Sequence, residues 1–355
     1  MINVHMKKIL CFALTLLLAA CRSGSKDASV YEIDLDAARP EAEFAPLVKI
    51  QEEITIDPSL LISSDLSVQV GRNSIVLLDM QTNQIHVLDR QGRLVHTISR
   101  RGNGPGEYSR IAKLFFDEQA GQICITDPDK NNLLIYNLEG EVVEVLKFEF
   151  ASMGYNNFTR WNGNYYIEHN NQPADEKYRF ALLQTDGKLQ LTGKYQPYET
   201  PLSAHVFSGD SFWTVGQDLL FFPRYSQTVY QVFPDREPEP SYSFSFGRHD
   251  LNREELFKIL GSGSIFMRDI LDADTISLLG ISQTSQTILA NTYCSGKAFV
   301  FCVDRKSRET KVFVLADREE RDPLMYPVST TGDCFVAKDE SDPDLLKIRL
   351  YTLDF

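Results

Sequence analysis

The sequence predicts an all-β fold, a six-bladed β-propeller closed by an N-terminal strand, and two observations lead to this prediction. One unit of short β-rich runs and turn residues occurs twice, at Ile75–Ile98 and Ile123–Leu146, 48 residues apart and without a gap. The 290 residues from Leu66 to Phe355 have room for about six such units. A repeat of this length, made of short strands, is typical of propeller blades.

Each repeat can be divided into strands and turns. Ile75–Leu78 is apolar at every position, which predicts an inner strand buried on both faces. Asp89–Gly92 and its copy Asn137–Gly140 have an Asp or Asn first and a glycine fourth, the composition of a type I turn. The third repeat is looser, and Gly187 is expected to be its turn glycine.

A glycine-rich segment, Gly102-Asn-Gly-Pro-Gly-Glu-Tyr108, follows the third strand of the first repeat. It predicts a loop from the outer edge of one blade to the inner strand of the next. The second repeat lacks the motif, so blades in general do not require it. A structural role is favoured, and the alternative is ligand contact through four residues: Arg101, Asn103, Glu107 and Tyr108.

The later part of the chain predicts two departures from a regular ring. Asn252–Glu255 resembles a capping box, and a short helical insertion is expected near residues 252–260. The last blade, after Met325, has too few residues for four strands. The strand-like stretch Val48–Ile56 is therefore predicted to pair beside the strands of residues 333–355 and to close the ring.

The first residues resemble a bacterial lipoprotein signal peptide, residues 1–20. Lys7 and Lys8 precede a short apolar run, and Leu18-Ala-Ala-Cys21 follows, which predicts cleavage before Cys21 and lipid on that residue. The alternative is an ordinary secretory signal cut near Ala20. The expected organisation is a lipidated tether and N-terminal segment at 21–44, then the propeller at 45–355, in an outer-membrane lipoprotein of the cell envelope.

The composition limits the classes of partner. Without Lys7 and Lys8, 34 basic and 49 acidic side chains remain, so a nucleic acid is not an expected partner. The membrane is expected to be contacted through the lipid only, and the domain to be a monomer. The four remaining cysteines show no disulfide spacing and are predicted to be free thiols: Cys124, Cys294, Cys302 and Cys334.

Aromatic and polar residues from the third and fourth repeats form the second set of ligand-binding candidates. Such platforms suit sugar or peptide recognition, and the alternative is packing between blades. The candidates are Trp161, Tyr166, His169, Trp213, Arg224 and Tyr225. Asp127–Asn131 resembles the start of a calcium loop but lacks its glycine and glutamate, which favours a blade turn.

No catalytic residue, cofactor or metal ligand is predicted. The function hypothesis is therefore a non-catalytic binding or scaffold module for a glycan, a peptide or an envelope protein. The alternative is a propeller hydrolase or lyase that uses a divalent metal in the central channel, which requires side chains from several blades to converge on the axis.

Taken together, these features resemble a family of six-bladed β-propeller lipoproteins with NHL-like repeats from Gram-negative gut bacteria. The resemblance covers roughly residues 45–355. It is carried by the lipobox, the glycine motif, the paired repeats, and Arg224–Tyr230 with Tyr242–Gly247. It implies a propeller on the outer envelope without an assigned activity, and it supplies no catalytic residues.

Overall fold

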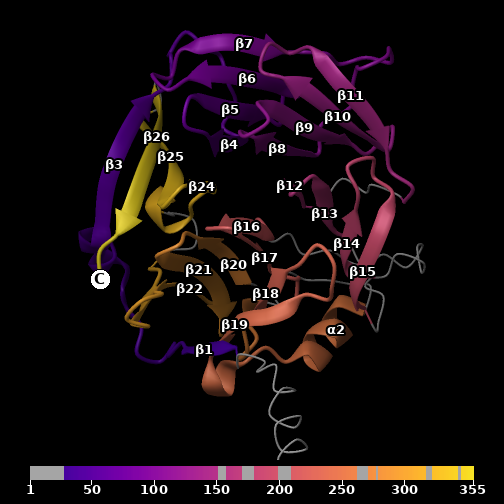
Figure 1. The fold of residues 1–355 in the computed structure, drawn as a ribbon. Coiled ribbons are helices and arrows are strands. Elements are labelled where there is room, and N and C mark those ends of the chain that lie inside the picture. Colours follow the sequence, from indigo (N-terminus) through magenta and orange to yellow (C-terminus); the bar gives the residue numbers. More distant parts are fainter. Residues whose placement is uncertain are drawn as a thin grey trace, which may run out of the picture.

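The computed structural model describes residues 28–150, 157–169, 180–198, 209–261, 271–276, 279–316, 322–342 and 345–355. Its strands form six sheets, which surround a common axis as the blades of a β-propeller (Figure 1). The predicted signal peptide and Cys21 lie outside the described residues. In the described part of the chain, no helix is long and apolar enough to cross a membrane.

The first three blades are regular four-stranded antiparallel sheets. Blade 1 contains β4 (Leu66–Val70), β5 (Ser74–Asp79), β6 (Gln84–Asp89) and β7 (Leu94–Ile98). Blade 2 contains β8 (Lys113–Asp117), β9 (Gln122–Asp127), β10 (Asn132–Asn137) and β11 (Val142–Lys147). Blade 3 contains β12 (Phe158–Trp161), β13 (Asn164–Glu168), β14 (Phe180–Thr185) and β15 (Leu191–Pro197).

The other three blades each include a strand from the N-terminal segment. Blade 4 contains β16 (Phe212–Val215), β17 (Asp218–Phe221), β18 (Thr228–Val232), β19 (Glu239–Ser245) and β1 (Ser29–Glu32). Blade 5 contains β20 (Leu279–Gln283), β21 (Thr287–Cys294), β22 (Lys297–Asp304), β23 (Thr310–Val314) and β2 (Arg39–Pro40). Blade 6 contains β24 (Ser329–Thr331), β25 (Cys334–Asp342), β26 (Leu345–Leu353) and β3 (Val48–Thr55).

The predicted ring closure is confirmed. β3 is the outermost strand of blade 6 and pairs antiparallel with β26, from Lys347 opposite Thr55 to Leu353 opposite Val48. The N-terminal and C-terminal parts of the chain are thus neighbours in one sheet, and the 48-residue period does end in six blades.

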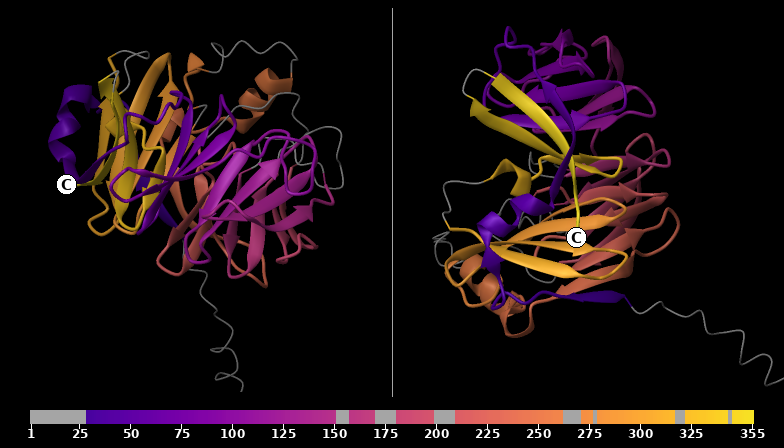
Figure 2. Two further views of the ribbon diagram at one scale, coloured as in Figure 1. Left: turned by 90° about the horizontal axis from the view of Figure 1, so that it is seen from above. Right: turned by 90° about the vertical axis from the view of Figure 1, so that its left-hand side faces the viewer.

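The segment before β3 also packs on the ring, which the sequence analysis did not anticipate. β1 pairs parallel with β19, and β2 pairs parallel with β23. Two 3₁₀ turns follow, η1 (Glu41–Glu43) and η2 (Ala45–Leu47), and Phe44 between them is fully buried against Phe313. This segment runs along the outside of blades 4 and 5 to blade 6 (Figure 2).

The predicted turns between the third and fourth strands are confirmed in the first two blades. The amide of Gly92 donates to the carbonyl of Asp89 (3.1 Å), and Gly140 repeats this bond to Asn137, both glycines having positive φ. In blade 3 the prediction of Gly187 is wrong. Leu189 occupies the positive-φ position and donates to Asp186, because the turn starts at Asp186 and its fourth residue is Leu189.

The innermost strand of blade 1 differs from the prediction. β5, which contains the apolar run Ile75–Leu78, is the second strand, and β4 lies between it and the axis. β4 alternates buried and half-buried residues, because one of its faces borders the central space. The all-apolar run is buried on both faces, as predicted, because it has blade neighbours on each side.

The predicted helical insertion is α2 (Arg253–Gly261), outside the ring of blades (Figure 1). Asn252 caps it: its Oδ1 accepts from the amide of Glu255 (3.2 Å), and its Nδ2 donates to the Glu255 carboxylate (3.3 Å). Leu256 is buried and attaches the helix to the domain. Smaller 3₁₀ turns are η4 (Gly247–His249) and η5 (Pro323–Met325). The four predicted free cysteines are unpaired.

Candidate functional site

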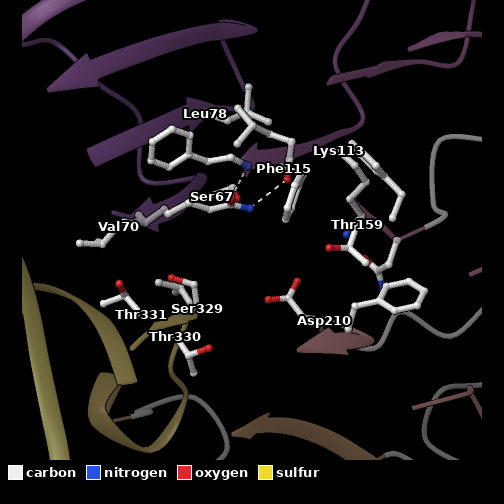
Figure 3. A pocket seen from close by; sticks show the side chains of 18 of the residues that line it. Ser67, Val70, Leu78, Lys113, Phe115, Thr159, Asp210, Ser329, Thr330 and Thr331 are labelled. Carbon is white, nitrogen blue, oxygen red and sulfur yellow. Dashed lines mark hydrogen bonds between the residues drawn. The ribbon is translucent and has the colours of Figure 1, made fainter. Parts of the chain in front are cut away.

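The innermost strands enclose a cavity of about 570 Å³ on the propeller axis (Figure 3). This volume lies within the range of roughly 300–1,000 Å³ that is usual for small-molecule sites. Hydroxyl groups from four blades line it: Ser67, Thr159, Ser211, Thr214, Ser329, Thr330 and Thr331. Phe115 and Phe212 add aromatic surface. A wall of this composition can hydrogen-bond a polar ligand and pack against its apolar parts.

The innermost strands begin at the same end of this channel. The Gln69 side chain joins β4 to β8, donating to the carbonyl of Leu114 (3.0 Å) and accepting from the amide of Phe116 (2.6 Å). Asn157, directly before β12, donates to the hydroxyl of Ser211, directly before β16 (2.9 Å). We call this end of the channel, where Lys113, Asn157 and Ser211 lie, the mouth.

Two charged side chains at the mouth, Lys113 and Asp210, make no hydrogen bond or ion pair with any described residue. Asp210 is exposed to the channel, where its carboxylate lies in the middle of the opening (Figure 3). The surrounding protein wall raises its pKa, and the charge of Lys113 only partly offsets this. Asp210 is therefore a carboxylate held near low-dielectric walls without a full counter-charge.

A buried ion pair lies next to the mouth, between blades 3 and 4. The Nε of Arg224 donates to the Oε1 of Glu168 (2.8 Å), and neither side chain is more than 5 % exposed. Burial alone would lower the pKa of Arg224, but the charge and hydrogen bond of Glu168 outweigh burial and raise it. Asn157 and Ser211 also donate to the Oε2 of Glu168, at 2.9 and 2.7 Å. Two residues of the channel wall are thus held by this ion pair.

The aromatic candidates are separated rather than gathered on one open surface. Trp161 and Tyr166 contact each other, with ring centroids 5.9 Å apart, and Tyr166 is fully buried. Trp213 is buried between blades 4 and 5. Tyr225 packs edge-on against Phe257 of α2. Packing within blade 3, between blades 4 and 5, and against α2 accounts for these contacts, and ligand binding by these residues stays a prediction.

His169 is buried beside the Glu168 pair, with its ring edge-on to Phe150 at 5.8 Å. Burial lowers its pKa to about 4, so the ring is neutral in the folded protein at neutral pH.

This burial predicts a loss of stability in acid. Because the folded pKa lies below the unfolded value of about 6.5, protons favour the unfolded chain as the pH falls from about 6.5 towards 4. The loss should reach about 3 kcal/mol at the low end of this window. His169→Gln should flatten this part of a pH series of chemical denaturation relative to the wild type. Equal slopes in wild type and His169→Gln would contradict the prediction.

The glycine-rich loop joins blade 1 to blade 2, as predicted. Tyr108 is fully buried, and its hydroxyl donates to the carbonyl of Asn83 (2.7 Å). The carboxylate of Glu107 accepts from the amide of Gly104 (2.7 Å), inside the loop. A side chain on Gly106 would place its Cβ 2.4 Å from Val142, and this glycine also has positive φ, so the motif requires glycine there. Arg101 and Asn103 are exposed.

The described residues bring together no group of three His, Cys, Asp or Glu side chains that could hold a metal ion. The predicted blade turn at Asp127 is present: its carboxylate accepts from the amides of Ser109 (2.7 Å) and Asp129 (3.1 Å). Asp79 does the same at the equivalent place in blade 1, where it accepts from the amide of Ser63 (3.0 Å).

The sequence analysis missed Lys113 and Asp210. They are far apart in the chain and meet only because inner strands of different blades converge on one axis. The single available signal was the position of each residue next to the start of an innermost strand, and the strand that begins at Lys113 was not assigned.

Two solved structures from Bacteroides share the fold. One is a "putative exported protein" from Bacteroides fragilis, with a TM-score of 0.74 and 16% identity, over 92% of this chain and 99% of that one. The other is a member of the DUF4221 family from Bacteroides vulgatus, with a TM-score of 0.53 and 10% identity, over 86% of this chain and 98% of that one. No curated protein matches the sequence. A family model described as a domain of unknown function, DUF4934, matches residues 55–338, and the chain therefore belongs to this family.

Proposed function

We propose that the protein is an exported, lipid-anchored propeller that binds a ligand at the mouth of its channel without transforming it. The observation that carries this proposal is the channel itself. Its wall combines hydroxyl groups with two oppositely charged side chains, Lys113 and Asp210, which make no hydrogen bond or ion pair with any described residue. Free polar groups converging in one cavity are typical of a binding site.

The exported location rests mainly on the lipobox at Leu18–Cys21. It is consistent with the name of the Bacteroides fragilis protein of the same fold. Lipid on Cys21 would hold the domain on the outer membrane, where it could act as a receptor or scaffold for a glycan, a peptide or an envelope protein.

The anchor is tested by Cys21→Ala. This variant should appear in the soluble fraction with its propeller intact, because the substituted residue lies before the described fold. The wild type should stay with the membrane and carry acyl mass on its N-terminal peptide, as mass spectrometry would show. Membrane retention of the variant, together with an unacylated wild type, would remove the lipoprotein assignment.

Binding is tested by screening the purified domain against glycan and peptide arrays, with a variant whose channel is filled. Thr330 is on the innermost strand of blade 6 and lines the cavity, so Thr330→Trp should obstruct it. The matched control, Gln91→Trp, puts the same side chain on an exposed outer turn. A ligand bound by wild type and by Gln91→Trp, but not by Thr330→Trp, supports the proposal. If Thr330→Trp is folded and abolishes no binding, the channel is not the site.

A further inference from the structure

We infer that the ligand of the channel mouth carries a primary ammonium group, and that this group pairs with the carboxylate of Asp210. The inference rests on the proposed function and adds to it the chemical class of the ligand. It covers amino sugars and peptide N-termini alike, because both can present the same group.

The first argument is that Asp210 has no partner. A fully buried carboxylate is normally paired or hydrogen-bonded, because desolvation of the charge is costly; Asp210 is exposed to the channel and bears only part of this cost, where the protein walls raise its pKa. The carboxylate of Glu168, just outside the channel wall, follows this rule with Arg224, Asn157 and Ser211. Asp210, next to Ser211 in the chain, has no hydrogen bond or ion pair among the described residues. A ligand cation would complete the counter-charge that Lys113 supplies only in part.

The second argument is the charge balance of the channel. Among the residues that the structure describes, four charged ones line it: Asp65, Lys113, Glu118 and Asp210. Glu118 follows β8 at the far end, where its carboxylate accepts from the backbone amide of Arg72. Asp65 directly precedes β4 and lies at the mouth with Asp210 and Lys113. Two carboxylates and one ammonium leave one net negative charge there, which a single ammonium group neutralises.

The third argument is the wall around Asp210. In Figure 3 its carboxylate lies between Thr159 on one side and Ser329 and Thr330 on the other. A primary ammonium has three N–H donors, of which Asp210 can accept one or two. Hydroxyl oxygens in the same wall can accept the rest. The hydroxyl of Ser329 has no hydrogen-bond partner in the described structure, but its oxygen is buried, so this side chain would have to rotate to meet a ligand in the channel.

The test uses matched pairs that differ only in the charge of the amine. Glucosamine is compared with N-acetylglucosamine, and trialanine with N-acetyl-trialanine, by isothermal titration of the mature domain. At least one free amine should bind about tenfold or more tightly than its acetylated partner, since an ion-paired hydrogen bond forms only with the former. The pair that shows the difference identifies the source as a sugar or a peptide.

Three variants locate the effect. Asp210→Asn keeps the shape of the side chain and should remove the preference for the free amine. Lys113→Met should strengthen binding of the free amine, because it removes the positive charge beside it. Asp235→Asn, on an exposed outer turn, makes the same chemical change away from the channel and should bind as the wild type does.

Two results would overturn the inference alone: no amine of the panel binds, or Asp210→Asn binds the free amines as tightly as the wild type. The proposed function can survive either result. If an uncharged glycan or blocked peptide binds and Thr330→Trp abolishes that binding, the channel is a binding site for another class of ligand. If Thr330→Trp abolishes no binding, both proposals fail.

Discussion

A chain that begins at Leu66 is expected not to form a cooperatively folded domain. It lacks β3, and without β3 the strand β26 has an unpaired edge and blade 6 is incomplete. It also lacks Ile54 and Ile56, which are buried between blades 6 and 1, and the packed segment around Phe44. Each such side chain contributes roughly 1.5–3 kcal/mol, against a total stability of about 5–15 kcal/mol for a domain.

Three truncated chains measure this effect by calorimetry. A chain that begins at Ser29 should melt as the mature protein does. One that begins at Val48 keeps β3 but lacks β1 and β2, so it should melt cooperatively at a lower temperature. The chain from Leu66 should show no cooperative transition or aggregate. A transition at the temperature of the Ser29 chain would show that the ring closes without β3.

The strands that could be identified from sequence alone are those whose burial produces a simple hydrophobic pattern in the sequence. β5 and β9 are buried on both faces and read as continuous apolar runs. β3 was found by a different argument, the shortage of residues in the last blade. The innermost strand of blade 1 was not assigned, although the Leu66–Val70 stretch does alternate, because a five-residue alternation next to polar loops is a weak signal.

β1 and β2 could not be predicted for a physical reason. They have four and two residues and pair in parallel with strands more than two hundred residues later in the chain. Nothing in a short edge strand specifies its partner, since the pairing uses backbone groups and the surrounding packing. The buried positions of Tyr31 and Phe44 follow from those pairings, not from any local periodicity.

The candidate site shows the same limit. Arg224 was singled out as a member of an aromatic and polar group, but its partner Glu168 was not, because the pair connects two blades. Lys113 and Asp210 have no motif around them. They form a site only because both side chains lie at the mouth of the channel. Their closeness depends on how the blades are arranged about the axis, which no local sequence pattern records.

The second large effect is expected at the Glu168–Arg224 pair. Arg224→Met removes the positive charge and leaves the fully buried Glu168 carboxylate without its counter-ion. Breaking one side of such a pair costs about 3–5 kcal/mol. Chemical denaturation should show this loss, whereas Lys188→Met, which breaks the exposed pair with Glu144, should leave the midpoint unchanged.

The double variant Glu168→Gln/Arg224→Met separates charge from packing. Glutamine can still accept hydrogen bonds from Asn157 and Ser211 but has no charge to desolvate, so the double variant should be more stable than Arg224→Met alone. Because Asn157 and Ser211 also line the channel, the double variant should also bind ligand more tightly than Arg224→Met does. If Arg224→Met is as stable as Lys188→Met, the hydrogen bonds of Asn157 and Ser211 suffice to hold the Glu168 charge, and the ion pair is not what ties blade 3 to blade 4.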